Sequence, residues 1–207
     1  MQNKTPLNAF IFDLGKVIVD WNPAYLLHEI ATDEAQLKFL VEEVLDLEWF
    51  RAVDAGYPLS QAVAERSEIY PEYADAMQLY VDRWPETIRG LFEGTLEVVR
   101  ELHASGAPLY VLSNWAGETW ARVEPDFAFL EFFDDVIISG HVGMAKPDTA
   151  IFEMARDRFN VDPTATLFID DGPKNVEAAM GIGFQAVVFE TPEKLRRDLI
   201  DLGVFAR

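Results

Sequence analysis

Five short apolar segments of strand length constrain the fold of this chain more than any other feature. They are continuously apolar, which is typical of strands buried on both faces of a parallel sheet. Helical patterns lie between the later segments. The segments are AFIFD (9–13), PLYVLS (108–113), DVIIS (135–139), TLFID (166–170) and QAVVF (185–189). This alternation predicts a doubly wound α/β domain.

The clearest helical pattern follows residue 95. The stretch TLEVVRELHASGAP carries apolar residues at Leu96, Val99 and Leu102. Gly106 is expected just beyond the end of this helix, and Pro108 follows it. The stretches DTAIFEMARDRFN (148–160) and KNVEAAMGIG (174–183) show the same kind of pattern.

One long region interrupts the alternation of strands and helices. Residues 21–89 contain no strand-like run, only amphipathic stretches such as DEAQLKFLVEEVLDL (33–47) and YADAMQLYVDRW (73–84). A loop of that length in a compact domain is expected to fold on its own account. We therefore predict a core formed by residues 1–20 and 90–207, with residues 21–89 inserted as an all-helical cap. The alternative is that these helices extend the main core.

Composition excludes several classes of function. With 17 basic and 36 acidic residues the net charge is −19, which argues against nucleic acid as a partner. An anionic substrate would need local positive charge, from a metal or a few bases. The absence of cysteine excludes disulfides, thiol catalysis and zinc–thiolate sites. With no signal-peptide pattern and no run near the ~20 apolar residues of a membrane span, we expect a cytoplasmic protein without a membrane partner. The sequence leaves the oligomeric state open.

Reactive residues stand at the ends of four predicted strands. They are Asp13, the pair 113–114 (Ser-Asn), Lys146 in the stretch after the third strand, and the pair 170–171 (Asp-Asp). Alone, each has an ordinary explanation as a turn, a helix cap or a surface residue. In open α/β sheets, however, ligands bind beyond the carboxyl ends of the strands. Their joint occurrence at one edge therefore favours an active site.

Four sequence motifs resemble those of a known enzyme family. FIFDLGKVIVD, VLSNW, GMAKPDTAIF and LFIDDGPKNVEAA resemble motifs one to four of the haloacid dehalogenase (HAD) superfamily. The helical insert occupies the position of that family's cap domain. The resemblance implies a magnesium-dependent phosphatase for small phosphorylated metabolites, with sugar phosphates among the candidates.

The resemblance also implies roles for the acidic residues. Asp13 would be the nucleophile, forming an aspartyl-phosphate that water later hydrolyses. Asp13 and Asp171 would bind Mg²⁺ together with the backbone carbonyl of Gly15. Asp170 would belong to the same metal site, more in its second coordination layer than as a direct ligand.

The remaining motif residues would contact the phosphate. Ser113 and the amide of Asn114 would hydrogen-bond phosphoryl oxygens. Lys146 would balance the charge of the clustered carboxylates and the phosphate, and would keep the nucleophile ionised. For Asn175, packing and hydrogen bonding within the site are both open.

Gly15 departs from the pattern of the family's phosphatases. Those enzymes carry a second Asp at this position, which acts as general acid and base. The chain could be a phosphatase for substrates whose leaving group needs little protonation. It could also be a phosphatase whose general acid is supplied by the cap or by the substrate. It could also be a 2-haloacid dehalogenase, or a catalytically weak binding protein. Asp20 could replace the missing acid, or it could cap the helix that begins near Pro23.

Cap residues usually select the substrate in the resembling family. Trp49, Phe50 and Arg51 stand together in LEWFRAVDAG and could meet a substrate, or could form a packed cap core with a surface arginine. Trp115 and Trp120 follow the second motif. They could line the pocket or pack beneath the cap.

Overall fold

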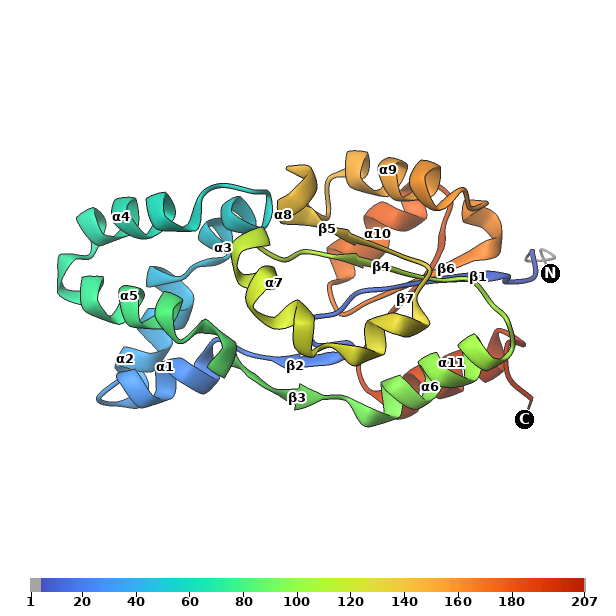
Figure 1. The fold of residues 1–207 in the computed structure, drawn as a ribbon, viewed down its shortest axis with the longest axis horizontal. Helices are drawn as coiled ribbons and strands as arrows, with labels where there is room; N and C mark the ends of the chain where they lie inside the picture. The colour runs from blue at the N-terminus through green and yellow to red at the C-terminus, as the bar shows by residue number, and fades with distance from the viewer. Residues whose placement is uncertain (1–4, 207) are drawn as a thin grey trace.

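A five-stranded parallel sheet forms the centre of the structure, a computed structural model that describes residues 5–206 (Figure 1). Its strands lie in the order β5-β4-β1-β6-β7, and every neighbouring pair is parallel. All five carboxyl ends therefore lie at the same edge. The strands are β1 (Ala9–Phe12), β4 (Leu109–Ser113), β5 (Asp135–Ile138), β6 (Thr166–Asp170) and β7 (Gln185–Val188). The five apolar segments are confirmed as strands.

Helices cover both faces of this sheet. In Figure 1, α9 (Thr149–Phe159) and α10 (Pro173–Gly181) lie on one face, with α6 (Glu93–Ala104) and α11 (Pro192–Asp201) on the other. Gly106 follows α6 with a φ of +78°, in the left-handed region expected beyond a helix end. The doubly wound α/β fold is thus confirmed.

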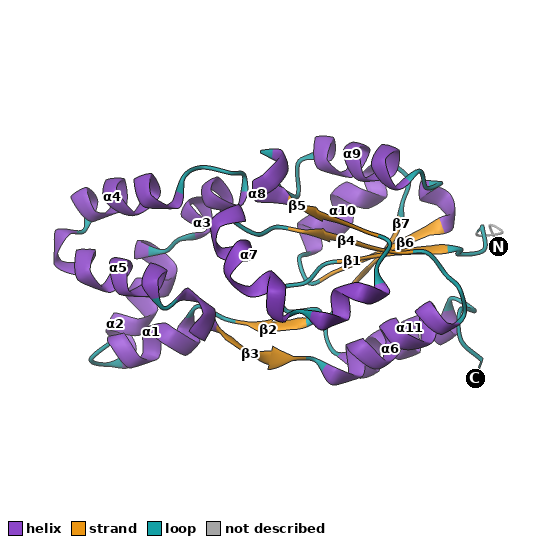
Figure 2. Ribbon diagram, viewed as in Figure 1, coloured by secondary structure: helices purple, strands orange, loops and turns teal. Residues whose placement is uncertain are grey.

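Most of the remaining helices gather beyond the carboxyl edge of the sheet, at the left of Figure 2. Two short strands, β2 (Val19–Trp21) and β3 (Ile88–Leu91), pair antiparallel at the base of this helical region. The sequence analysis did not predict them, because three or four residues with little alternation carry no strand pattern. The division into a core and a cap at 20/21 and 89/90 stays a prediction. The helices are α1 (Ala24–Ile30), α2 (Glu34–Phe39), α3 (Leu47–Asp54), α4 (Leu59–Ile69) and α5 (Ala74–Asp82).

The helical stretch 33–47 is interrupted. After α2 the chain makes a π-helical turn over Leu40–Val44, and α3 then starts afresh because the Asp46 side chain accepts a hydrogen bond from Trp49 N at 2.8 Å. Shorter helical pieces are α7 (Gly117–Val123), α8 (Ser139–Val142) and 3₁₀ turns at Pro71–Tyr73, Trp84–Thr87, Glu124–Asp126, Ala128–Phe132 and Pro163–Ala165. Among the helices of residues 5–206, none has both the length and the apolar character needed to cross a membrane.

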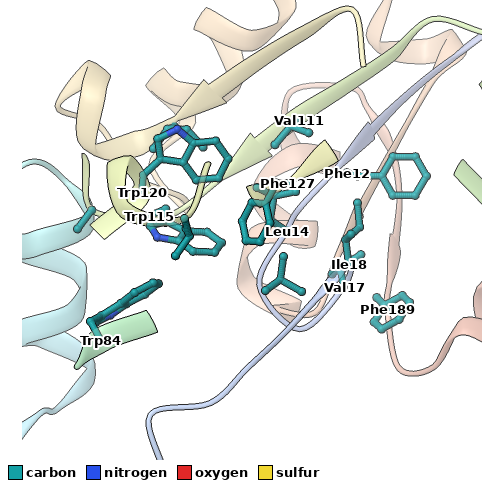
Figure 3. Packing of buried hydrophobic residues seen from close by; sticks show 14 of the residues in the cluster. Phe12, Leu14, Val17, Ile18, Trp84, Val111, Trp115, Trp120, Phe127 and Phe189 are labelled. Carbon is teal, nitrogen blue, oxygen red and sulfur yellow. The ribbon is translucent and has the colours of Figure 1, made fainter. Parts of the chain in front are cut away.

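Aromatic residues connect the helical region to the sheet (Figure 3). Trp84, which follows α5, packs against Trp115 with ring centroids 5.5 Å apart. Trp115 in turn packs against Trp120 at 5.4 Å and Phe127 at 6.1 Å. Because these rings are buried, they hold the helical region against the loop that follows β4.

Candidate active site

Asp13 stands directly after β1 and is fixed through one of its two carboxylate oxygens. Oδ1 accepts hydrogen bonds from Leu14 N at 2.7 Å and from Ser113 Oγ at 2.7 Å, and lies 3.0 Å from Lys146 Nζ. No donor among residues 5–206 reaches the other oxygen, Oδ2. The side chain is therefore held in one orientation with an oxygen left free for chemistry.

Lys146 provides the positive charge of this site from a fully buried position. Its Nζ contacts Asp170 Oδ2 at 2.6 Å and Leu112 O at 2.8 Å, in addition to Asp13. Burial lowers the pKa of Lys146, but the two adjacent carboxylates outweigh it and hold the pKa above the usual range. Lys146 therefore remains an ammonium at neutral pH.

Asp170 lies at the end of β6 and has both oxygens engaged. While Oδ2 faces Lys146, Oδ1 accepts hydrogen bonds from Gly172 N at 2.7 Å and Asn175 Nδ2 at 2.8 Å. Asn175 thus takes the second of its two open roles, hydrogen bonding within the site. Because its oxygens are already occupied, Asp170 is better suited to position its neighbours than to bind a metal directly.

Three carboxylates nevertheless form a group that could hold a cation. Asp13, Asp170 and Asp171 each offer an oxygen, and these oxygens lie within 4.8 Å of one another. Burial, with added repulsion from Asp170 and Asp171, raises the pKa of Asp13 to about 7, although Lys146 and Ser113 oppose the increase. Burial and the charge of Asp170 also raise the pKa of Asp171. Such an excess of crowded negative charge, offered by oxygen atoms, fits a hard cation such as Mg²⁺.

Two further residues were expected to take part. The carbonyl of Gly15 accepts no backbone hydrogen bond from residues 5–206, and its expected role as a metal ligand stays a prediction. The Asn114 side chain is committed to the loop instead: its Nδ2 donates to Lys146 O at 2.9 Å and its Oδ1 accepts from Lys146 N at 2.8 Å. This reciprocal pair fixes the backbone that carries Lys146. A role for the Asn114 amide in binding phosphate stays a prediction.

A cavity of about 380 Å³ opens from Gly15 and Asn114 toward the helical region. Trp49, Phe50 and Trp115 are among the residues that line it. Arg51 is exposed and is not one of the lining residues, so the interpretation as a surface arginine is correct. Trp120 packs behind Trp115 and is buried in the core.

The interpretation of Asp20 as a helix cap is wrong. The residue lies within β2, and its Oδ1 accepts a hydrogen bond from Tyr25 Oη at 2.7 Å. The N-cap position of α1 is Pro23, without a side-chain capping bond, and just before it Asn22 Oδ1 accepts a hydrogen bond from Ala24 N at 2.9 Å. Asp20 also does not line the cavity that Gly15 lines, so it is not placed to replace the missing general acid.

Asp54, a residue that the sequence analysis did not single out, does line the cavity. It is the last residue of α3. Burial and the charge of Asp13 raise its pKa to about 7, while Lys146 and the backbone amide of Ala116 oppose the increase. Asp54 therefore lies within electrostatic reach of the nucleophile. The only sequence signal is an acid two residues before Gly56, which is too common to identify a site.

Comparison with known proteins decides the family. A family model for haloacid dehalogenase-like hydrolases matches residues 7–183. The chain belongs to this family of hydrolases. The resemblance inferred from the four motifs is thereby confirmed, and Asp13, Lys146 and Asp170–Asp171 all lie within the matched residues.

Curated relatives of this HAD-like hydrolase include proteins with different substrates in their names. A drimenol cyclase of Aspergillus calidoustus is 24% identical over 95% of this chain, although the chain spans only 36% of that protein. A sesquiterpene phosphatase of Aspergillus oryzae is 25% identical, with 86% of this chain and 88% of the relative covered. A D-ribitol-5-phosphate phosphatase of Bacteroides thetaiotaomicron is 25% identical, with 93% and 97% covered.

Solved structures share the fold. A HAD-like family hydrolase from Porphyromonas gingivalis has a TM-score of 0.75 at 23% identity, covering 96% of this chain and 98% of its own. A HAD family enzyme from Bacteroides thetaiotaomicron, in complex with magnesium and inorganic phosphate, has a TM-score of 0.68 at 20% identity, covering 89% and 95%. An L-2-haloacid dehalogenase from Xanthobacter autotrophicus has a TM-score of 0.63 at 18% identity, covering 94% and 83%. These likenesses establish the fold.

Proposed function

We propose that this hydrolase is a Mg²⁺-dependent phosphatase that acts on small phosphorylated metabolites through an aspartyl-phosphate on Asp13. One observation supports this proposal above the others. The Asp13 carboxylate is fixed through Oδ1 by Leu14, Ser113 and Lys146, and keeps Oδ2 free beside a group of carboxylates that could hold a cation. An oriented carboxylate of this kind is suited to nucleophilic catalysis.

The proposed reaction consists of two successive displacements at phosphorus. In the first, a carboxylate oxygen of Asp13 attacks the phosphorus, and the bond from phosphorus to the ester oxygen breaks. In the second, water attacks the same phosphorus and the bond to Asp13 breaks, which returns the carboxylate and releases phosphate. Lys146 favours the ionised form of Asp13 and partly neutralises the incoming phosphate.

Asp13, Asp171 and the carbonyl of Gly15 would hold the Mg²⁺ ion, with Asp170 behind them. The ion would supply positive charge between an anionic nucleophile and an anionic substrate, in a chain whose net charge is −19. The related Bacteroides enzyme was solved with magnesium and inorganic phosphate, which supports the assignment.

The dehalogenase alternative rests on Gly15 and on the likeness to the Xanthobacter dehalogenase. Displacement of halide from carbon needs neither a general acid nor a metal. The group formed by Asp13, Asp170 and Asp171 favours the phosphatase, because a reaction without a metal has no need to crowd three carboxylates. The names of the relatives include a sesquiterpene and a sugar alcohol phosphate, so these names do not identify the substrate class of this chain.

Phosphate release from a panel of phosphomonoesters tests the proposal, with Mg²⁺ and with EDTA, for the wild type and Asp13→Asn. We expect turnover only with Mg²⁺, and its loss in Asp13→Asn. Release of halide from 2-chloropropionate without metal, in place of phosphate release, would establish the dehalogenase instead. Ligand binding without turnover in both proteins would indicate a binding role.

A further inference from the structure

The cavity above the nucleophile is walled mainly by aromatic and aliphatic side chains. Six aromatic residues contribute to its surface, together with apolar residues of α3, α4 and the π-helical turn. The aromatic residues are Trp21, Trp49, Phe50, Tyr80, Trp84 and Trp115. Lys16 and Asp54 are the only charged residues of the lining within residues 5–206. The Lys16 ammonium lies 5.7 Å from the ring centre of Trp21, which engages it in a cation–π contact.

Three polar side chains that line the cavity already have hydrogen-bond partners within the protein. Asn22 Oδ1 accepts from Ala24 N, Asn114 is paired with the backbone of Lys146, and Thr119 Oγ1 donates to Ala116 O. Polar atoms of Trp21, Tyr80 and Trp115 have no partner within residues 5–206, but they are shielded from solvent and so are not offered to a ligand. A ligand hydroxyl in this space would lose its hydrogen bonds to water with little in exchange.

We propose, on the basis of the phosphatase function above, that the natural substrate is the phosphate monoester of an apolar alcohol and not a sugar phosphate. Its phosphate would lie at Asp13, and its hydrocarbon part would fill the aromatic cavity. A volume of about 380 Å³ is within the range of pockets that enclose small organic ligands. Burial of the hydrocarbon against these rings would supply the binding free energy.

The test compares n-octyl phosphate with glucose 6-phosphate and ribitol 5-phosphate, which are all esters of primary alcohols and differ in polarity. Acetyl phosphate serves as a reference substrate without a large organic group. We expect kcat/KM in the presence of Mg²⁺ to be at least tenfold higher for n-octyl phosphate than for either sugar derivative. A preference for the sugar derivatives would overturn this inference and leave the phosphatase intact. No turnover of any substrate, acetyl phosphate included, would overturn the phosphatase and this inference with it.

Two matched variants test whether the hydrocarbon part of the substrate binds in the cavity. Leu47 lines it and is 64% exposed, whereas Ile69, at the end of α4 and 63% exposed, does not line it. We expect Leu47→Ser to lower the kcat/KM ratio of n-octyl phosphate to acetyl phosphate about fivefold, because an apolar contact is lost. Ile69→Ser should leave the ratio at its wild-type value. Equal ratios in the two variants would contradict the placement.

A second observation concerns the acid that Gly15 does not supply. Asp54 lines the same cavity as Gly15. The chain beyond Asp54 is held against α7 and α8: a Cβ on Gly56 would lie 3.2 Å from Gly140 O in α8, and Leu59 N donates to Glu118 Oε1 in α7 at 3.1 Å. Asp54 is thus followed by a segment that is fixed in place, and it is not carried on a free helix end.

We infer that Asp54 serves as the general acid and base of the reaction. When Asp13 attacks the phosphorus and the ester bond breaks, the Asp54 carboxylic acid gives its proton to the departing alkoxide, which leaves as the alcohol. The Asp54 carboxylate then accepts a proton from the water that attacks the aspartyl-phosphate. Phosphate and the Asp13 carboxylate are released, and Asp54 is protonated again.

Dependence on the leaving group separates this role from a structural one. For Asp54→Asn we expect kcat to fall about a hundredfold or more on the fastest alkyl or sugar phosphate of the panel, since an alkoxide needs protonation. On p-nitrophenyl phosphate, whose leaving group needs little protonation, kcat should fall less than about tenfold. An equal loss on both substrates, or no loss, would overturn the inference.

A rescue and a control complete this test. A Cβ on Gly15 would meet nothing within 4 Å, so a carboxyl placed there can enter the cavity. We expect Gly15→Asp to restore alkyl phosphate hydrolysis at least tenfold in the Asp54→Asn background. Glu48→Gln, an exposed carboxyl on the same helix, should keep wild-type kcat. Thermal melting would check that Asp54→Asn and the double variant are folded. If they are folded and Gly15→Asp does not restore hydrolysis, the loss of kcat in Asp54→Asn has another cause than a missing general acid.

Discussion

At the scale of single residues, Lys146 links the chemistry of the site to its stability. Its ammonium contacts Asp13 and Asp170 while buried, so removing it leaves carboxylates without a counter-charge. Breaking a buried ion pair from one side is far more costly than losing a surface pair. The same contacts that orient the nucleophile therefore also stabilise the fold.

We expect Lys146→Met to lower the free energy of unfolding by about 3 kcal/mol or more, measured by urea denaturation at pH 7. Lys194→Met is the matched control, because Lys194 is 32% exposed and pairs with Asp198 at the surface. Its loss should cost less than about 1 kcal/mol. Equal costs for the two variants would show that the charge of Lys146 is dispensable for folding.

Two glycines of the site region should respond differently to alanine. Gly15 has open space beyond its Cα, whereas a Cβ on Gly140 would collide with Gly117 N and lie 2.8 Å from Trp115 O. We expect Gly15→Ala to change the free energy of unfolding by less than about 1 kcal/mol, and Gly140→Ala to reduce it by about 2 kcal/mol or more. Thermal and urea unfolding of both proteins measure the difference.

At the scale of elements, α3 carries Asp54 and begins at a well-defined cap. Asp46 accepts a hydrogen bond from Trp49 N and contacts Arg66 Nη1 at 2.9 Å. Burial raises the pKa of Asp46, but these two partners outweigh it and place the pKa below the usual range. The start of the helix is therefore stabilised by the ionised form of the carboxyl.

We expect Asp46→Ala to cost about 1 kcal/mol at pH 7, and Asp46→Asn less, because asparagine still caps a helix. A lowered pKa contributes stability that is present above the ordinary value and is lost as pH falls through the folded value. The difference between wild type and Asp46→Ala should therefore shrink below about pH 3.9. Urea unfolding across this range checks the sign, and a difference that grows toward low pH would contradict it.

The sequence predicted the sheet far better than the helical region. Continuous apolar runs identify strands buried on both faces, so all five strands were found, and with them the edge that gathers Asp13, Ser113, Lys146 and Asp170. The start of α3 was missed because the cap at Asp46 lies inside an amphipathic run. The pairing of β2 with β3 was missed because it joins residues far apart in the chain.

The part of the site contributed by the helical region could not be predicted for a physical reason. Asp54 acquires its position only because the loop after α3 packs against Gly140 and Glu118, and such contacts leave no periodic pattern. Local patterning also cannot show that the side chains of Asn22, Asn114 and Thr119 use their hydrogen bonds within the protein. The apolar character of the cavity is visible only in the folded chain.

At the scale of the whole molecule, the net negative charge and the burial of apolar side chains have opposite effects on the stability of the folded state. The chain carries 36 acidic and 17 basic residues, so the folded state concentrates negative charge. Its buried core runs without interruption from the sheet into the helical region through Trp84 and Trp115. The two regions are therefore expected to unfold together.

We expect the free energy of unfolding to rise as NaCl is increased from low concentration to about 0.15 M, because screening at a Debye length of about 8 Å reduces the repulsion between acidic groups. Exposed ion pairs such as Lys38–Glu42 lose attraction under the same change, but each contributes little. Urea midpoints at constant pH measure the balance. A midpoint that falls with salt would show that ion pairs outweigh the net charge.

Asp13 is central to the proposed activity, and its covalent phosphorylation is the most direct test. Wild-type enzyme would be mixed with Mg²⁺ and an excess of a phosphomonoester that it hydrolyses, quenched in acid during turnover, digested and examined by mass spectrometry. We expect the mass of one phosphoryl group on the peptide that contains Asp13, and none in Asp13→Asn. Phosphate release without any modified Asp13 peptide, or a phosphoryl group on another residue, would contradict the assignment of Asp13 as the nucleophile.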